Sequence, residues 1–268
     1  MVDFPNAKIN IGLFVTERRQ DGYHNLETII FPVPGLCDAL EVVEADSFSF
    51  TVSGLVIPGN PAENIVTKAY NLLKADFNLP EFAIHLHKKI PFGAGLGGGS
   101  SDGAFMLRML NFGFHLGLNL DELKDYARKL GADCPFFIEN IPAFATGTGE
   151  ILKPVSVDLS GYETIIIKPP FNISTSGAYS SVKPGKAGCY LPEVVTRPPE
   201  FWQKDVYNDF ENHLFLKYPE LKMLKSLLYT EGAKYASMSG SGSSIYGIFE
   251  TIPAGIEQKL PPGCFFYR

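Results

Sequence analysis

The sequence predicts a protein of mixed helix and strand structure in two domains, and three observations support this. Short apolar runs with period-two alternation are separated by turn residues in the first half, as in antiparallel strands. Apolar stretches at helical spacing alternate with further strand runs in the second half. With 268 residues the chain exceeds the usual length of one domain, so we place a boundary near residue 155, giving domains 1–155 and 156–268.

Composition narrows the functional classes. An apolar content of 45% and a charged content of 19% are ordinary for a soluble globular protein. The net charge of −6 argues against nucleic acid as a partner, and no apolar stretch approaches the length that crosses a membrane. The 4 cysteines are scattered without metal-ligand or redox spacing. We therefore expect reduced thiols and a cytoplasmic location.

The first strand carries polar residues in unusual positions. Residues 6–16 alternate with period two, and Lys8, Asn10 and Gly12 share the face opposite to an apolar one. A solvent-facing side is the usual explanation of such a pattern, and a ligand-binding side is the alternative. Asp21-Gly22 then predicts a turn that returns the chain toward this strand.

Periodicity and capping residues place the remaining elements. Strands joined by short turns predict antiparallel pairing. The expected strands cover 27–33, 39–45, 48–52, 82–90, a pair within 143–153, 162–168, 233–238 and 244–249. The expected helices cover 65–77, the segment after residue 100, 121–130, a start at 174–179, 208–217 and 219–230. Residues 183–200 are rich in proline and are expected to be irregular.

A glycine-rich loop lies between a predicted strand and a predicted helix. Residues 90–104 read IPFGAGLGGGSSDGA, with 5 glycines in 7 positions. Backbone N–H groups without obstructing side chains would converge there at a helix N-terminus, where an anion is stabilised. A phosphate is the expected guest. The turn Ser239-Gly-Ser-Gly-Ser243 predicts a second anion-suited loop.

The glycine loop matches two common nucleotide-binding motifs poorly. No lysine follows the glycines, so the loop is not a P-loop. Gly93, Gly95 and Gly98 match the dinucleotide fingerprint, but that fingerprint belongs to the first strand of its fold and needs an acidic residue about twenty positions later. The loop lies far from the first strand, so its place in the chain argues against a nicotinamide dehydrogenase. A titration with NADH would test this alternative.

An aspartate follows the end of the helix at 121–130. Asp133 stands between Gly131, a helix-ending glycine, and the apolar run Cys-Pro-Phe-Phe, so we expect it to be partly buried. A capping role and a chemical role are equally compatible with this position. Cys134 beside it fits the core better than a nucleophile.

Five sequence blocks together resemble the GHMP kinase superfamily, across about residues 6–250. They are AKINIGL, RRQDGYHNLET, PFGAGLGGGSS, LGADCPFF and SGSGS, in this order. The resemblance implies an α+β fold of two domains with a cleft between them. The N-terminal domain would be ribosomal protein S5 domain 2-like and the C-terminal domain ferredoxin-like. The DGYH and LGADCPFF blocks favour members that phosphorylate a cytidine-diphosphate sugar alcohol with ATP in the non-mevalonate isoprenoid route.

The resemblance also implies residue roles. Lys8 and Asp133 match the active-site pair, so that a cation would keep the basic carboxylate ionised. The triphosphate loop would comprise Pro91, Phe92, Gly93, Ala94, Gly95, Leu96, Gly97, Gly98, Gly99, Ser100 and Ser101. Lys88 and Asn64 would lie toward the adenine. The substrate residues would be Asn10, Tyr23, His24, Thr175 and Tyr179, with Tyr23 and His24 beside the cytosine and Tyr23 and Tyr179 offering it aromatic rings.

The expected cofactor is Mg²⁺ with ATP, and Ser101 is a candidate metal ligand. Asp102 stands where several relatives carry asparagine or alanine. An acid so close to the triphosphate must pair with Mg²⁺ or point away. His85 and His87 share a strand face, but no third ligand is evident.

The expected partner is a small molecule, with neither nucleic acid nor membrane, and the protein would be a monomer or a homodimer. Two further alternatives remain. Another kinase of the superfamily, for mevalonate or homoserine, would usually lack the DGYH block. A catalytically silent nucleotide-binding module would make Lys8 or Asp133 dispensable.

Overall fold

The computed structural model describes all 268 residues, and they form two compact units. The first unit comprises Met1–Lys8, Pro32–Phe92 and Gly97–Ile141, and the second comprises Ile9–Phe31, Gly93–Leu96 and Pro142–Arg268. The two units are interleaved along the chain, because the strands Asn6–Arg18 and His24–Cys37 and the glycine loop each pass from one unit to the other. The division of the sequence near residue 155 stays a prediction.

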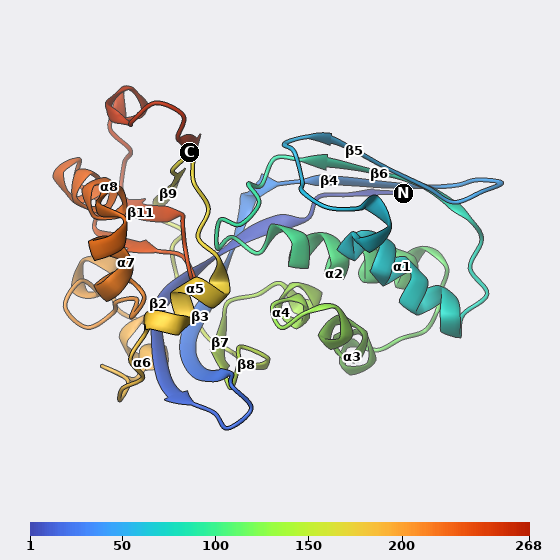
Figure 1. The fold of residues 1–268 in the computed structure, drawn as a ribbon, viewed down its shortest axis with the longest axis horizontal. Coiled ribbons are helices and arrows are strands. Elements are labelled where there is room, and N and C mark those ends of the chain that lie inside the picture. Colours follow the sequence, from blue (N-terminus) through green and yellow to red (C-terminus); the bar gives the residue numbers. More distant parts are fainter. The chain divides into compact units, whose positions relative to one another are not determined.

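The first unit packs helices on a four-stranded sheet (Figure 1). The sheet order is β1 (Val2–Asp3), β4 (Ala39–Glu44), β6 (Phe82–Lys88) and β5 (Ser49–Gly54). The helices are the 3₁₀ turn η1 (Pro61–Glu63), α1 (Ile65–Asp76), α2 (Gly98–Gly113), α3 (Leu120–Leu130) and α4 (Cys134–Glu139). In β6 the residues alternate between buried and half-buried, and Phe82 packs its ring against Tyr70 of α1 at 5.4 Å between centroids. Burial of one such side chain contributes about 1.5–3 kcal/mol.

The prediction of purely antiparallel pairing is wrong in this sheet. β4 pairs antiparallel with β6, but β5 pairs parallel with β6. The connection from β5 to β6 contains η1 and α1, which is long enough for a crossover between parallel strands. The glycine loop follows β6, which lies between one antiparallel and one parallel neighbour. This arrangement differs from the parallel sheet of a dinucleotide-binding fold.

The second unit contains two sheets. One has the order β2 (Asn6–Arg18), β3 (His24–Cys37), β7 (Ala143–Thr146) and β8 (Ile151–Pro154). The other has the order β10 (Tyr235–Met238), β11 (Ile245–Phe249), β9 (Glu163–Lys168) and β12 (Phe265–Tyr267). The helical elements are α5 (Thr175–Ser181), α6 (Leu191–Val194), η2 (Pro199–Phe201), α7 (Glu211–Lys217), α8 (Pro219–Thr230) and η3 (Ile256–Lys259).

One apolar core joins these elements of the second unit. Leu13 and Val15 of β2 lie in the same buried cluster as residues of β9, β10, β11, α7 and α8. α8 packs against β10 and β11. This packing brings the start of α7 beside the end of β10, where Glu211 bonds to Met238.

Most predicted elements are present, and the missed ones are short. β1, β12, α4 and α6 have between 2 and 6 residues, too few for a period to be recognised. The segment 183–200, predicted to be irregular, contains α6 and the start of η2. None of the helices combines the length and the apolar character that a membrane crossing requires.

Candidate active site

Lys8 and Asp133 form an ion pair in the first unit. The side chain of Lys8 lies on β2 and is buried, with the whole residue 4% exposed, so the solvent-facing interpretation of this strand face is wrong. Lys8 Nζ lies 3.5 Å from Asp133 Oδ2. The side chain of Asp133 is 40% exposed. A buried cation therefore stands behind a carboxylate that a ligand can reach.

Asp133 occupies the N-cap position of α4 without acting as a cap. Its φ and ψ are −82° and −15°, and its side chain makes no capping hydrogen bond to the helix. A capping aspartate normally accepts a bond from the second or third N–H of its helix. The alternative capping role is therefore not observed. The carboxylate faces Lys8 and keeps acceptor capacity for a substrate hydroxyl.

The second half of the glycine loop starts helix α2 close to Lys8. Gly97 is the N-cap residue, with a φ of +70°. A Cβ on Gly97 would lie 2.9 Å from Lys8 Cγ and 2.9 Å from Phe137 Cζ, so only glycine fits. Ser101 N donates to Gly97 O at 2.9 Å. The N–H groups before it lie at the positive end of a helix of 16 residues, where phosphate oxygens are stabilised.

Asp102 points away from the loop into a buried ionic group. Its Oδ2 lies 2.6 Å from Lys88 Nζ, which also pairs with Asp38. All three residues are at most 5% exposed. Burial is the largest cause that raises the pKa of the Asp102 carboxyl well above its ordinary value, which favours the neutral acid. The acid beside the glycine loop is thus directed inward.

The structure places the two residues expected near the adenine in structural roles. Lys88 is 5% exposed and its ammonium is engaged by the two aspartates. Asn64 is half-buried at the start of α1, and its Oδ1 accepts from Val66 N at 2.9 Å. Ser101 is fully buried, and its hydroxyl has no hydrogen-bond partner in the chain. Their ligand roles stay predictions.

The tip of the glycine loop, in the second unit, rests on the turn Ser239–Ser243. Gly95 has a φ of +75°, and a Cβ there would lie 2.1 Å from Ser239 O. Ser239 Oγ donates to Gly95 O at 2.8 Å, and Ser244 N donates to Ala94 O at 3.1 Å. Two successive carbonyl groups of the loop are therefore held by this turn.

Several N–H and O–H donors of the turn are already used in hydrogen bonds within the protein. Ser239 N donates to Ser244 O at 2.9 Å, and Gly242 N donates to Ser239 O at 3.0 Å. Ser243 Oγ donates to Phe171 O at 2.8 Å. These contacts favour a supporting role for the turn, and the anion-binding role stays a prediction.

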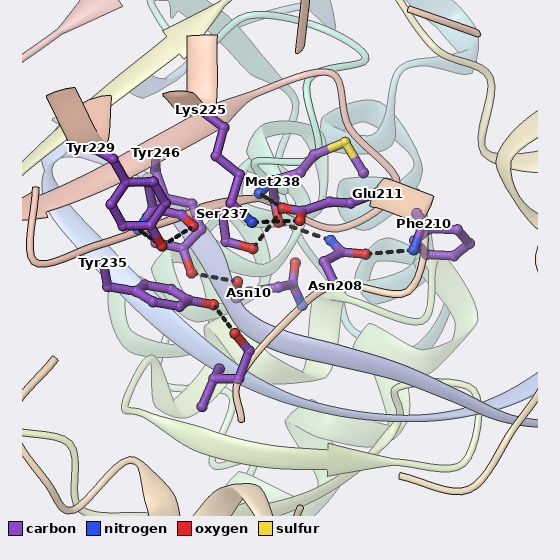
Figure 2. A network of polar contacts seen from close by, with 12 residues as sticks. Asn10, Asn208, Phe210, Glu211, Lys225, Tyr229, Tyr235, Ser237, Met238 and Tyr246 are labelled. Carbon is purple, nitrogen blue, oxygen red and sulfur yellow. Dashed lines mark hydrogen bonds and ion pairs between the residues drawn. The ribbon is translucent and has the colours of Figure 1, made fainter. Parts of the chain in front are cut away.

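Asn10 is fixed from two sides in the second unit. Its backbone N donates to Ser239 Oγ at 3.2 Å, and its backbone O accepts from Tyr246 OH at 2.9 Å. Figure 2 shows the Tyr246 hydroxyl directed at Asn10. The side-chain Nδ2 donates to Thr28 Oγ1 at 3.1 Å. The residue is 4% exposed, so its side chain is oriented before any ligand arrives.

Two of the predicted cytosine residues, His24 and Tyr179, contact each other in the second unit. The rings of His24 and Tyr179 lie 5.1 Å apart at 31°, and Tyr179 packs edge-on against Phe210 at 4.8 Å. Tyr23 is 66% exposed. Burial, followed by the charge of Arg18, lowers the pKa of His24, so its ring is neutral near pH 7 and offers one donor and one acceptor.

Thr175 connects this region with the turn Ser239–Ser243. Its Oγ1 lies 3.3 Å from Ser241 Oγ. Thr175 is the first residue of α5, and Ser174 caps that helix by accepting from Gly177 N at 3.1 Å. The cap fixes the start of α5, on which both Thr175 and Tyr179 stand.

The remaining sequence candidates have structural surroundings. Cys134 is fully buried, and burial raises the pKa of its thiol to about 12, which makes it a poor nucleophile. His85 and His87 share hydrogen bonds with Ser53, at 2.9 Å each. The chain contains no group of three or more His, Cys, Asp or Glu side chains placed to hold a metal.

Sequence reasoning missed three residues that hold the site. Asp38 anchors Lys88, Asn208 bonds to the end of β10, and Thr28 orients Asn10. Asp38 and Asn208 are each 1% exposed and Thr28 is 2% exposed. Their partners are distant in sequence, so no local pattern identifies them.

Two domain families match the chain. The family described as GHMP kinases N terminal domain matches residues 64–147, and the family described as GHMP kinases C terminal matches residues 199–261. The first match includes the glycine loop and Asp133, and the second includes the turn Ser239–Ser243.

Similar proteins carry one common name. The 4-diphosphocytidyl-2-C-methyl-D-erythritol kinase of Bacteroides thetaiotaomicron is 52% identical over 254 residues, covering 93% of this chain and 92% of that protein. The protein of the same name from Parabacteroides distasonis is 47% identical and covers 100% of this chain and 98% of its own length. A crystal structure of 4-(cytidine 5'-diphospho)-2C-methyl-D-erythritol kinase superimposes with a TM-score of 0.80 at 33% identity, covering 92% of this chain and 90% of that one.

More distant structures share the fold alone. The homoserine kinase of Cytophaga hutchinsonii has a TM-score of 0.71 at 16% identity, and it covers 98% of this chain and 93% of its own. This similarity agrees with the two-domain α+β architecture predicted from the sequence.

Proposed function

Because the chain belongs to the 4-diphosphocytidyl-2-C-methyl-D-erythritol kinases within the GHMP kinase family, we propose that it catalyses the reaction which that name describes. The γ-phosphoryl group of ATP would move to the 2-hydroxyl of 4-diphosphocytidyl-2-C-methyl-D-erythritol, in the non-mevalonate (methylerythritol phosphate) isoprenoid pathway. The observation that supports this chemistry best is the pair of a buried Lys8 and an accessible Asp133 beside the start of α2. We place the reaction in the cytoplasm.

Asp133 is the proposed general base. Phosphoryl transfer depends mainly on positioning and on charge stabilisation, with a carboxylate that accepts the proton of the attacking hydroxyl. Asp133 is exposed enough to receive that hydroxyl and is not occupied by a helix cap. Lys8 sits behind it and would steady both the carboxylate and the negative charge that develops on the transferred group.

The glycine loop is the proposed triphosphate site. The N–H groups at the start of α2 would donate to phosphate oxygens, and the positive φ at Gly97 aims the loop backbone at them. Mg²⁺ usually binds through substrate phosphates and one or two carboxylates, so the absence of a protein cage fits a metal that arrives with ATP. The unpartnered Ser101 hydroxyl is the candidate protein ligand, which leaves Asp133 free to act as the base. The metal would neutralise charge on the β- and γ-phosphates.

The residues of the second unit are proposed to select the substrate. A neutral His24 can both donate to and accept from cytosine, which carries a ring acceptor and an amino donor. Tyr23 and Tyr179 would supply aromatic faces, and Thr175 and Asn10 would supply hydrogen bonds. Asn64 and Lys88 stay proposed for the adenine side, with Lys88 acting through its ionic partners. All of these residues belong to one chain, so a monomer or a homodimer would serve.

An assay of ADP release tests the reaction. The purified protein is given ATP and Mg²⁺ with 4-diphosphocytidyl-methylerythritol, mevalonate, homoserine or galactose in separate reactions. We expect turnover with the cytidine compound alone. Turnover with one of the others would keep the kinase chemistry and overturn the substrate. No turnover with any of them would indicate a nucleotide-binding module instead.

The base is tested by Asp133→Ala. We expect turnover to fall about 10²- to 10⁴-fold while the protein still folds, because the proton acceptor is lost. Asp121→Ala is the matched control, since Asp121 is an exposed aspartate in the first turn of α3. Near-normal turnover of the Asp133 variant would remove this residue from the role of base.

A further inference from the structure

The turn Ser239–Ser243 is itself held in place by a buried asparagine. Asn208 lies just before α7 and is 1% exposed. Its Nδ2 donates to Met238 O and to Gly240 O, both at 2.8 Å. Its Oδ1 accepts from Phe210 N at 3.0 Å. The carboxamide therefore uses both N–H groups and its oxygen, and the pattern fixes its orientation (Figure 2).

Glu211 also forms hydrogen bonds to the end of β10. Its Oε1 accepts from Met238 N at 2.8 Å and from Ser237 Oγ at 3.0 Å, and its Oε2 pairs with Lys225 Nζ at 2.5 Å. Both backbone groups of Met238 are thus bonded to side chains from the start of α7. Figure 2 shows Asn208 and Glu211 reaching Met238 together.

The segment that carries Asn208 is itself anchored to β2. Leu13 N donates to Tyr207 O and Asp209 N donates to Leu13 O, both at 2.9 Å. Asp209 Oδ2 accepts from Val15 N at 2.7 Å. The carboxamide therefore projects from backbone that cannot shift without breaking its hydrogen bonds to β2.

From Asn208 a short series of contacts leads to the ligand-binding residues. Asn208 holds the carbonyls on either side of Ser239. Ser239 Oγ in turn donates to Gly95 O of the glycine loop and accepts from Asn10 N. A shift of the turn would move the loop tip and Asn10 together.

We propose that Asn208 is a positioning residue for the kinase reaction. It would fix the position of the Ser239–Ser243 turn, and through this turn the conformation in which the glycine loop binds ATP. The proposal rests on the function proposed above. Asn208 is buried and would act through the backbone carbonyls of Met238 and Gly240, without a direct contact to either substrate. Because Gly95 and Ala94 are contacted directly by the turn, the main effect is on ATP.

The test is Asn208→Asp, which keeps the shape of the side chain and removes its two N–H donors. We expect the KM for ATP to rise about 10- to 100-fold, because small misplacements of binding groups have effects of this size. A buried aspartate takes up a proton readily and then regains one donor. The KM of this variant should therefore recover partly as the pH is lowered, while the wild-type KM does not follow this trend.

Asn111→Asp is the matched control. Asn111 also bonds its carboxamide to backbone, at Leu118 O and Leu118 N, both at 3.0 Å. It lies near the far end of α2, about 20 Å along the helix from the glycine loop. Both variants should lose thermal stability, but only Asn208→Asp should change the KM for ATP. Equal stability losses with an unchanged KM for ATP in both would overturn the proposal.

Ser239→Ala keeps the question answerable if Asn208→Asp does not fold. It removes one hydroxyl and the bonds to Gly95 O and Asn10 N, and it leaves the backbone intact. A raised KM for ATP supports the proposal, and an unchanged KM contradicts it. Direct titration of each variant with ATP separates this outcome from failure of the proposed function, because ATP affinity can be measured without any phosphate acceptor.

Discussion

Two buried polar groups support the glycine loop, and they differ in charge. In the first unit, Asp38, Lys88 and Asp102 form an ionic group in which one ammonium pairs with two carboxylates. In the second unit, Asn208 and Ser239 form a neutral group that donates to backbone carbonyls. Each group is buried, so neither exchanges its partners readily for water.

The ionic group acts on the start of the loop and on α2. Asp38 Oδ1 accepts from Lys89 N at 2.6 Å and from Ile90 N at 2.9 Å, where the chain leaves β6. Lys88 joins this carboxylate to Asp102 in the first turns of α2. The strand end and the helix start are therefore coupled through one ammonium.

Because the two groups differ in charge, substitutions in them should destabilise the protein to different extents. Removal of one member of a buried ion pair leaves a charge without compensation, which is strongly destabilising. Removal of a neutral donor costs about 1–3 kcal/mol for each acceptor left unsatisfied. The ionic group should thus control whether the first unit folds, and the neutral group should control how the loop is shaped.

The largest expected effect is on the stability of Lys88→Met. We expect the free energy of unfolding at neutral pH to fall by about 3–5 kcal/mol, because two buried acidic side chains lose the cation that they share. Urea denaturation measures it. Lys74→Met is the control, since Lys74 pairs with Glu81 at a side-chain exposure of 36%, where solvent screens the pair, and its loss should be much smaller.

The double variant Lys88→Met with Asp102→Asn tests the electrostatic origin of this loss. Removal of one carboxylate should restore part of the stability, which a double-mutant cycle quantifies. A loss in Lys88→Met no greater than in Lys74→Met would erase the distinction between the ionic and the neutral group.

Next in size is a pair of glycine substitutions, one for each part of the loop. Gly95→Ala would place a Cβ 2.1 Å from Ser239 O, so the loop tip and the turn must separate. We expect the KM for ATP to rise about 100-fold. Gly97→Ala would place a Cβ 2.9 Å from Lys8 Cγ and displace the active-site lysine, so we expect kcat to fall more than the KM rises. Steady-state kinetics at varied ATP distinguishes the two patterns.

Gly161→Ala is the control for both, because a Cβ there meets no atom within 4 Å and its φ is not in the left-handed region. It should change stability by about 0.5 kcal/mol or less and leave kinetics intact.

Gly97→Val carries a larger side chain than Gly97→Ala into the space beside Lys8 and should abolish ATP binding. Normal ATP affinity in that variant would contradict the placement of the loop.

The sequence predicted the elements of the site better than their supports. Lys8, the glycine loop and Asp133 lie in blocks whose local pattern is distinctive: a cation on an apolar strand, glycines before a helix, and an acid after a helix end. In the structure Lys8 Nζ lies 3.5 Å from Asp133 Oδ2, although the two residues are 125 positions apart in the sequence. The resemblance anticipated this pair, and periodicity alone did not.

The supports could not be predicted because their meaning depends on tertiary contacts. Nothing local distinguishes Asn208, which precedes a helix as many asparagines do, from an ordinary cap. The resemblance implies a place for Lys88 toward the adenine, and that stays a prediction, but it does not reveal the ionic group that Lys88 forms on the buried face of β6. The parallel pairing of β5 with β6 was missed for a similar reason, since β5 and β6 are joined through η1 and α1 and no local pattern gives the order of strands so connected.

The smallest expected effect distinguishes the two groups by pH. The folded-state pKa of Asp102 is raised, chiefly by burial, so the folded protein holds a proton that the unfolded chain releases. Its contribution to stability is therefore fully present below the ordinary aspartate pKa and is lost as the pH rises toward the raised one. Asp102→Asn has no such proton, so its stability relative to the wild type should improve as the pH rises, while activity changes only a few-fold.

Urea denaturation at several values from about pH 5 to pH 8 measures this difference. Ser239→Ala, in the neutral group, removes no titratable side chain and should follow the wild-type curve at a constant offset. Parallel curves for Asp102→Asn and the wild type would mean that Asp102 keeps its charge at neutral pH. In that case Lys88 would compensate both carboxylates at once, and Lys88→Met should then show the upper end of its expected loss, because neither carboxylate would be relieved by a proton.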